Sequence, residues 1–74
     1  MSRAPARPVK HSLTLRGHRT SVSLESEFWQ AFREIAAARD ITINALAIEI
    51  DEARQTDIGL ASAIRVYVLN HFRK

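Results

Sequence analysis

The cationic side chains of this 74-residue chain gather near its N-terminus. Residues 1–24 contain five Lys or Arg side chains and no Asp or Glu: Arg3, Arg7, Lys10, Arg16 and Arg19. Clustered positive charge attracts the phosphate backbone of nucleic acids and releases the counterions bound to it. The chemistry that this segment suggests is therefore polyanion binding, and a basic tail that only raises solubility is the alternative.

The rest of the chain carries its charge differently. All eight acidic residues fall in residues 25–57, where they meet only three bases, and residues 58–74 add three further bases. The three blocks therefore carry net charges of +5, −5 and +3. The first block coincides with the part of the chain that is expected to be extended, so the positive charge should line a strand or an arm.

Other chemistries find little support in the residue types. There are no cysteines, and His11, His18 and His71 do not have the spacing of metal ligands. The only glycines are Gly17 and Gly59, so no phosphate-binding glycine loop exists. The serines have no base and orienting group placed near them in the sequence. We expect no enzyme activity, no metal and no cofactor.

The length allows one small domain. A chain of this size buries only about 60% of the surface that its unfolded form exposes, so it is marginally stable alone. Without disulfides or a metal, oligomerisation is the expected remedy. No apolar run approaches the roughly 20 residues that span a bilayer, and residues 1–8 lack the apolar stretch of a secretory signal. We therefore expect a cytoplasmic protein with no membrane partner.

The elements that position the basic residues begin with a predicted flexible basic arm at residues 1–8, where two prolines prevent regular structure. Residues 10–16 and 19–24 alternate between apolar and polar side chains, which predicts strands with one buried face. With Gly17-His18 as a two-residue turn, Leu13 would lie opposite Val22. Alternatively, residues 9–16 form an extended arm.

Three helices are expected after the strands. Apolar side chains recur at helical spacing over about residues 25–38, 43–54 and 60–72. Ser23 is a candidate N-cap for the first helix and Thr42 for the second. The connection between these two helices is very short, and Asp40 is suited to the left-handed conformation that such a corner often needs. The domain would thus span residues 9–74.

The order of these elements carries a resemblance. Residues 20–24 (TSVSL), the helix that follows, and residues 41–46 (ITINAL) resemble the ribbon-helix-helix superfamily of Arc, MetJ and CopG type repressors. Residues 16–25 (RGHRTSVSLE) with Phe28-Trp29, together with residues 64–69 (IRVYVL), are similar to short bacterial proteins described as predicted ribbon-helix-helix DNA-binding proteins. The match covers about residues 9–73. It implies a mainly helical fold with a short β-ribbon, an extra C-terminal helix and an intertwined homodimer.

The resemblance also implies a DNA site. Outward-facing residues of the strand at 19–24 would contact base edges, namely Arg19, Ser21 and Ser23. The N-terminus of the second helix would bind a phosphate through Thr42, Ile43 and Asn44. Further phosphate contacts would come from Arg3, Arg7, Lys10 and Arg16. The apolar stripes would form a dimer core of Val22, Leu24, Phe28, Phe32, Ile35, Leu46 and Ile50.

The function expected from these features is that of a DNA-binding transcriptional regulator, a nucleoid-associated repressor whose partner is double-stranded DNA. The homodimer could assemble further into a tetramer. Two features depart from the superfamily pattern, because serines discriminate bases poorly and a strand at residues 10–16 would widen the sheet. The alternative is a protein-interaction module, antitoxin-like or a scaffold, that uses the C-terminal helix as its partner surface.

Overall fold

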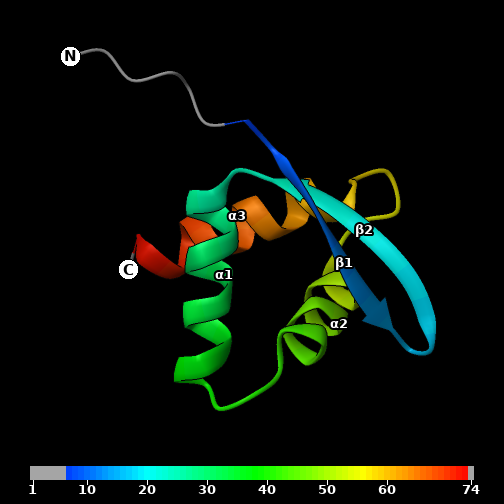
Figure 1. Ribbon diagram of the computed structural model, residues 1–74, viewed down its shortest axis with the longest axis horizontal. Helices are drawn as coiled ribbons and strands as arrows, with labels where there is room; N and C mark the ends of the chain where they lie inside the picture. Colours follow the sequence, from blue (N-terminus) through cyan, green and yellow to red (C-terminus); the bar gives the residue numbers. More distant parts are fainter. Residues whose placement is uncertain (1–6, 74) are drawn as a thin grey trace.

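The computed structural model describes residues 7–73 and shows the predicted fold class. The elements are β1 (Val9–Leu15), β2 (His18–Leu24), α1 (Ser26–Ala38), α2 (Ile43–Ala53) and α3 (Leu60–Phe72) (Figure 1). A short ribbon is followed by two helices and an extra C-terminal helix, as expected. Most of the predicted arm, residues 1–6, lies outside the described residues. Within residues 7–73, no helix is both long and apolar enough to cross a membrane.

Residues 9–15 form a strand and not an arm. β1 pairs antiparallel with β2 in a two-stranded sheet, and the turn between them consists of Arg16 and Gly17. Both turn residues have positive φ, 52° for Arg16 and 83° for Gly17. This is the pattern of a type I′ turn, whose twist matches that of the flanking strands.

The predicted register of the hairpin was wrong by two residues. The sequence placed the turn at Gly17-His18 and Leu13 opposite Val22, whereas Leu13 lies opposite Thr20 and Val22 opposite His11. A shift of two residues leaves every side chain on its predicted face, because side chains alternate with a period of two. The alternation therefore could not reveal the error, which arose because Arg16, a non-glycine residue, adopts a positive φ.

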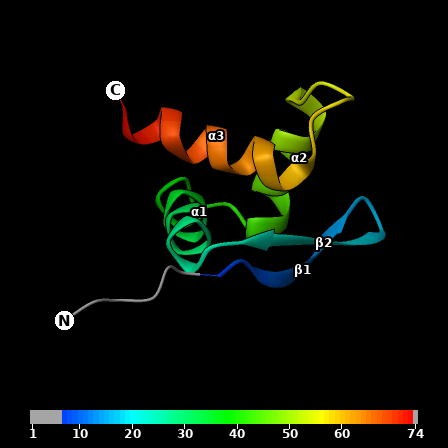
Figure 2. The same cartoon turned by 90° about the horizontal axis from the view of Figure 1, so that it is seen from above.

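The hairpin forms one layer and the helices form the other. All three helices lie on the same side of the ribbon, so the opposite face of the ribbon is uncovered by the described chain (Figure 2). The covered face presents Leu13, Leu15, Val22 and Leu24, all of which are buried. This arrangement separates an apolar inner face from a polar outer face.

Local signals explain the corner between α1 and α2 and the start of α2, but not the start of α1. The predicted N-cap at Ser23 was wrong, because α1 has Glu25 at this position and no side-chain cap. Asp40 has a φ of 58°, the left-handed conformation expected at the corner. Thr42 caps α2 as predicted, since its Oγ1 accepts a hydrogen bond of 3.0 Å from the Ala45 amide.

The core is complete within one chain. Of the seven residues that the sequence assigned to a dimer core, six are buried and Phe28 is half-buried without any partner copy. β1 supplies the second strand, and α3 adds Ile64 and Val68 to the core. A lone strand would leave its backbone hydrogen bonds unsatisfied and would need a second copy to pair with. This chain pairs its own two strands, so its ribbon forms without a second copy.

Arg39 joins all three helices at the end of the core. From the C-terminal cap of α1, its guanidinium donates to both carboxylate oxygens of Glu49 on α2, and also to the Tyr67 hydroxyl on α3 at 3.3 Å. The hydrogen bonds from Arg39 lower the pKa of Glu49, while Glu49 and Tyr67 raise the pKa of Arg39. The contact links the three helices to one another at the surface of the protein.

Candidate nucleic-acid interface

The outer face of the ribbon carries only cationic and hydroxyl side chains. β1 and β2 contribute three residues each, paired across the strands and all exposed: Lys10 with Ser23, Ser12 with Ser21, and Thr14 with Arg19. We call these six residues the outer ribbon face. A cation stands at each end, on opposite strands, and four hydroxyl groups lie between them. Hydroxyl groups both donate and accept hydrogen bonds, while Arg and Lys bind guanine or phosphate.

The predicted base-contacting residues all belong to this face. Arg19, Ser21 and Ser23 are exposed on β2 and alternate with the buried Val22 and Leu24. Ser12 and Thr14, which the sequence analysis did not include, share the same face. Their signal was present in the alternation of residues 10–16. It went unused because that segment was treated as a strand or an arm and not as half of the ribbon.

Three contacts hold β1 against the helices. The Thr14 amide donates a 3.1 Å hydrogen bond to Asn44 Oδ1 at the start of α2. The His11 ring stacks on Trp29 of α1 with ring centroids 3.9 Å apart. At the turn, Arg16 pairs with Asp51 at 3.0 Å. β1 is therefore attached to α1 through His11 and to α2 near its end through Thr14, and the turn that follows is attached to α2 through Arg16.

Arg65 of α3 holds the end of β2. Its guanidinium donates at 2.9 Å to the Glu25 carboxylate and at 3.2 Å to the Ser23 carbonyl. The hydrogen bond from Arg65 lowers the pKa of Glu25. The last carbonyl on the outer edge of β2 is thereby occupied by a side chain of the same chain.

The N-terminus of α2 lies beside the ribbon. The hydrogen bond between Asn44 and Thr14 brings the first turn of α2 next to the edge of β1. Thr42 is exposed, and Ile43 and Asn44 are half-buried. The first amides of a helix have no partner within the helix, and they carry partial positive charge. The predicted phosphate-contacting residues therefore lie close to the outer ribbon face, although the Asn44 side chain is already engaged.

The other predicted phosphate contacts have different surroundings. Arg7 is exposed just before β1, and Lys10 belongs to the outer ribbon face. Arg16 forms ion pairs with Asp51 and, at 3.2 Å, with Glu52, so two carboxylates offset its charge. Arg3 lies outside the described residues. Lys10 and Arg7 are thus better placed to meet a phosphate than Arg16 is.

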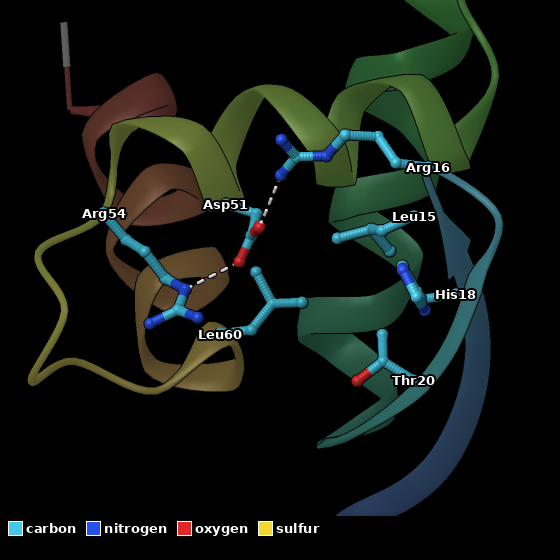
Figure 3. Close-up of a pocket in the computed structure, with 7 residues that line it drawn as sticks. All are labelled: Leu15, Arg16, His18, Thr20, Asp51, Arg54 and Leu60. Carbon is cyan, nitrogen blue, oxygen red and sulfur yellow. Dashed lines mark hydrogen bonds and ion pairs between the residues drawn. The ribbon is translucent and has the colours of Figure 1, made fainter.

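A cavity of about 470 Å³ lies under the tip of the hairpin, between the turn and the helices α2 and α3 (Figure 3). Both of its arginines are paired with Asp51, since Arg54 Nε donates to this carboxylate at 2.7 Å and Arg16 contacts it from the other side. His18 and Thr20 line the cavity from the inner face of β2, and both are exposed. The ion pair of Arg16 with Asp51 connects the turn to α2 across this cavity.

A second exposed surface is apolar. Val66, Leu69 and Phe72 of α3 are exposed to 54%, 51% and 61%. Beside them runs a groove of about 490 Å³ between α2 and α3, lined in part by Ile58, Ala63 and Val66. We call Val66, Leu69 and Phe72 the α3 apolar face. Among residues 7–73, no group of three or more His, Asp or Glu side chains is arranged to hold a metal ion.

A two-stranded ribbon followed by two helices across a tight corner defines a ribbon-helix-helix fold. A ribbon-helix-helix domain model matches residues 8–72, nearly the whole chain. The chain belongs to this family, whose members are in general DNA-binding, regulator-type proteins that bind DNA as dimers and are typically not enzymes. Comparisons with curated proteins and with solved structures gave no match.

Proposed function

We propose that this protein is a transcriptional regulator that places its ribbon in the major groove of double-stranded DNA. The observation that carries the proposal is the outer ribbon face, which is exposed, free of acidic groups and lined by two cations and four hydroxyl groups. A two-stranded β-ribbon fits the major groove, where base edges present distinct donors and acceptors. Family membership supports the same function at the general level.

Each part of the interface has a distinct task in this proposal. Arg19 donates two hydrogen bonds to a guanine, and Ser21 and Ser23 bond to base edges beside it. The amides of Ile43 and Asn44 at the start of α2 hold a backbone phosphate and so fix the orientation of the ribbon. Arg7 and Lys10 add phosphate contacts, which raise affinity for every sequence.

The proposal includes a homodimer that acts as a repressor in the bacterial cytoplasm, bound to the nucleoid. Dimeric binding is the general habit of the family. Two copies on neighbouring half-sites would add their contacts, so the dimer would bind a paired site far more tightly than one copy binds a single half-site. Sedimentation of the free protein and of its DNA complex measures the number of chains directly.

The DNA-binding proposal is tested by fluorescence anisotropy of a labelled mixed-sequence duplex. The measurement is repeated across a salt series that starts at about 50 mM. We expect tight binding at low salt and a steep negative slope of log affinity against log salt concentration, because each phosphate contact releases counterions. A charge-reversed variant, Lys10→Glu with Arg19→Glu, should lose most of this binding. Absence of binding at tens of micromolar wild-type protein and low salt would sink the proposal.

The α3 apolar face favours a second candidate function, a protein-interaction module. Large apolar side chains that stay exposed next to a groove are typical of a surface that another protein covers. Deletion of α3 cannot test this role, because Ile64 and Val68 of the same helix are buried in the core. Val66→Ser with Leu69→Ser changes only the exposed side.

The double serine variant separates the two candidates. If the α3 apolar face binds a protein and the ribbon binds DNA, the variant retains DNA affinity and loses only self-association or capture of a partner. If the variant binds DNA as weakly as the charge-reversed ribbon variant while remaining folded by circular dichroism, the α3 apolar face belongs to the DNA-binding mechanism and is no separate interaction surface.

A further inference from the structure

We propose that one chain supplies both strands of the ribbon that enters the groove, so that Lys10, Ser12 and Thr14 of β1 contact DNA together with β2. This inference rests on the proposed DNA-binding function and adds residues to its site. It differs from the intertwined homodimer that the sequence resemblance implies, in which each chain contributes one strand.

The pairing of the two strands places these residues. β1 and β2 pair over their full length, Val9 with Leu24 to Leu15 with His18. The ribbon is therefore complete before any second copy binds. Lys10, Ser12 and Thr14 lie directly opposite Ser23, Ser21 and Arg19, so a groove that admits one row of side chains also meets the other row.

The width of the major groove favours a ribbon made by one chain over a sheet made by two chains. Neighbouring strands lie about 4.8 Å apart, so a two-stranded ribbon is narrow enough for a groove about 12 Å wide. If the free edge of β2 paired with β2 of a second copy while each β1 stayed in place, the sheet would have four strands. Its outer strands would lie about 14 Å apart before side chains are added, and the groove would not admit it.

β1 cannot easily detach from the rest of the fold to let β2 pair with a second copy in a two-stranded ribbon. It is held by the Thr14 to Asn44 hydrogen bond, the stack of His11 on Trp29 and the ion pair of Arg16 with Asp51. It also contributes Leu13 and Leu15 to the core. Removing β1 from the fold would expose these two leucines and break all three contacts.

The free edge of β2 is short. In the register of this hairpin, Arg19, Ser21 and Ser23 direct their backbone groups away from β1, as the outward amide of Thr14 does on the other edge. The Ser23 carbonyl is already bound by Arg65. Among the described residues, the edge groups left to pair with a second copy are those of Arg19 and Ser21 and the Ser23 amide. A short edge of this kind limits pairing between chains.

A disulfide that locks β1 to β2 tests the inference. Ser12 and Ser21 face each other at a pair whose backbone groups point outward, a position where the Cα separation suits a disulfide. The chain has no cysteine of its own, so Ser12→Cys with Ser21→Cys introduces the only two thiols. A second lock, Lys10→Cys with Ser23→Cys, places the bond at the other end of the ribbon.

The probe is the labelled duplex that each reduced variant enriches from a randomised library. The affinity of the reduced form of a variant for this duplex is compared with that of the diamide-oxidised form of the same variant, so both forms carry identical substitutions. Non-reducing electrophoresis and mass spectrometry verify that the bond is within one chain. We expect the oxidised and reduced forms to bind with equal affinity in at least one of the two locks.

The outcomes separate this inference from the proposed function. A loss of more than about a hundredfold on oxidation in both locks, with tight binding by the reduced forms, overturns the single-chain ribbon and leaves DNA binding in place. Wild-type protein and reduced variants that enrich no duplex overturn both. Retained affinity with an intrachain bond supports the inference, because the strands then cannot separate to form a ribbon between chains.

Discussion

The outer ribbon face and the α3 apolar face are both exposed, yet their chemistry is opposite. The ribbon presents hydroxyl groups between Lys10 and Arg19, whereas α3 presents Val66, Leu69 and Phe72. Each surface is the exposed side of an element whose inner side is buried, but only the ribbon is polar on its exposed side, whereas α3 presents apolar side chains on both sides. Exposure alone therefore does not define a binding site, and the kind of side chain that is exposed indicates the kind of partner.

The comparison also shows how the chain solves the problem of small size. β1 pairs with one edge of β2, and α3 packs on α1 and α2 and covers the core there (Figure 2). In the proposed dimer, a second copy would therefore serve DNA binding and not the covering of the core. This separation predicts that substitutions on the two exposed faces change binding, while substitutions on the two inner faces change stability.

The largest expected effect distinguishes the two sides of α3. Ile64 is fully buried and Leu69 is half exposed. We expect Ile64→Ala to lower the free energy of unfolding by about 2–5 kcal/mol, because it leaves a cavity in a packed core. Leu69→Ala should change it by less than about 0.5 kcal/mol. Urea unfolding of both variants makes the comparison, and equal losses would show that Leu69 is covered in solution.

A second pair compares arginines inside and outside the proposed interface. We expect Arg19→Ala to weaken binding to a selected duplex by about 1–3 kcal/mol, the usual contribution of a bidentate contact to guanine. Arg33, on the exposed side of α1, is the charge-matched control, and Arg33→Ala should leave affinity nearly unchanged. Equal effects would mean that only total charge matters and would remove Arg19 from the base-contacting residues.

The third expectation concerns the hairpin turn. Gly17 has a φ of 83° with no atom near the position of a Cβ, so the cost of Gly17→Ala is conformational. We expect a loss of about 1–2 kcal/mol in the free energy of unfolding. Gly17→Asn is the control at the same position and should cost less than Gly17→Ala, because Asn tolerates the left-handed conformation. A loss for Gly17→Asn as large as that for Gly17→Ala would contradict the type I′ turn.

The smallest expected effect is a pH dependence of stability that comes from Glu25 and Glu49. Arg65 lowers the pKa of Glu25 beside the ribbon, and Arg39 lowers the pKa of Glu49 beneath it. A carboxyl group with a lowered pKa stabilises the fold above its ordinary value of 4.5, and the contribution is lost as the pH falls through the lower value. Stability should therefore decrease below about pH 4.5.

Glutamine variants isolate this contribution. Glu25→Gln and Glu49→Gln should each be less stable than the wild type at pH 7, and the difference should shrink at pH values below the lowered pKa. Urea unfolding at a series of pH values measures it. A difference that stays constant down to pH 3 would show that the carboxylate charge is not its source.

Elements with a strong local signal were predictable from the sequence. The apolar stripes of the helices, the left-handed Asp40 and the Thr42 cap depend on neighbouring residues, and the structure shows all of them. The faces of the strands followed from alternation. The register did not, because the period of two fixes only which face a side chain lies on, and nothing local indicated a positive φ at Arg16.

Contacts between distant residues were not predictable. The hydrogen bonds of Asn44 to Thr14 and of Arg65 to Ser23 join residues 30 and 42 positions apart, and no spacing rule in the sequence reports them. For the same reason the burial of Val22 and Leu46 within one chain was missed, since it depends on where β1 and α3 pack. The candidate contacts Lys10, Arg19, Ser21 and Ser23 were named from the sequence, whereas Ser12 and Thr14 joined the candidate face only through the pairing of the strands.

The most direct test of the account is a titration of the ¹⁵N-labelled protein with duplex DNA, followed by two-dimensional NMR. We expect shifts and broadening of the amide signals of β1, β2 and the first turn of α2, because these surround the outer ribbon face. The signals of Val66, Leu69 and Phe72 should move little. Changes confined to β2 would contradict the single-chain ribbon, and changes centred on α3 would contradict the ribbon as the DNA-binding surface.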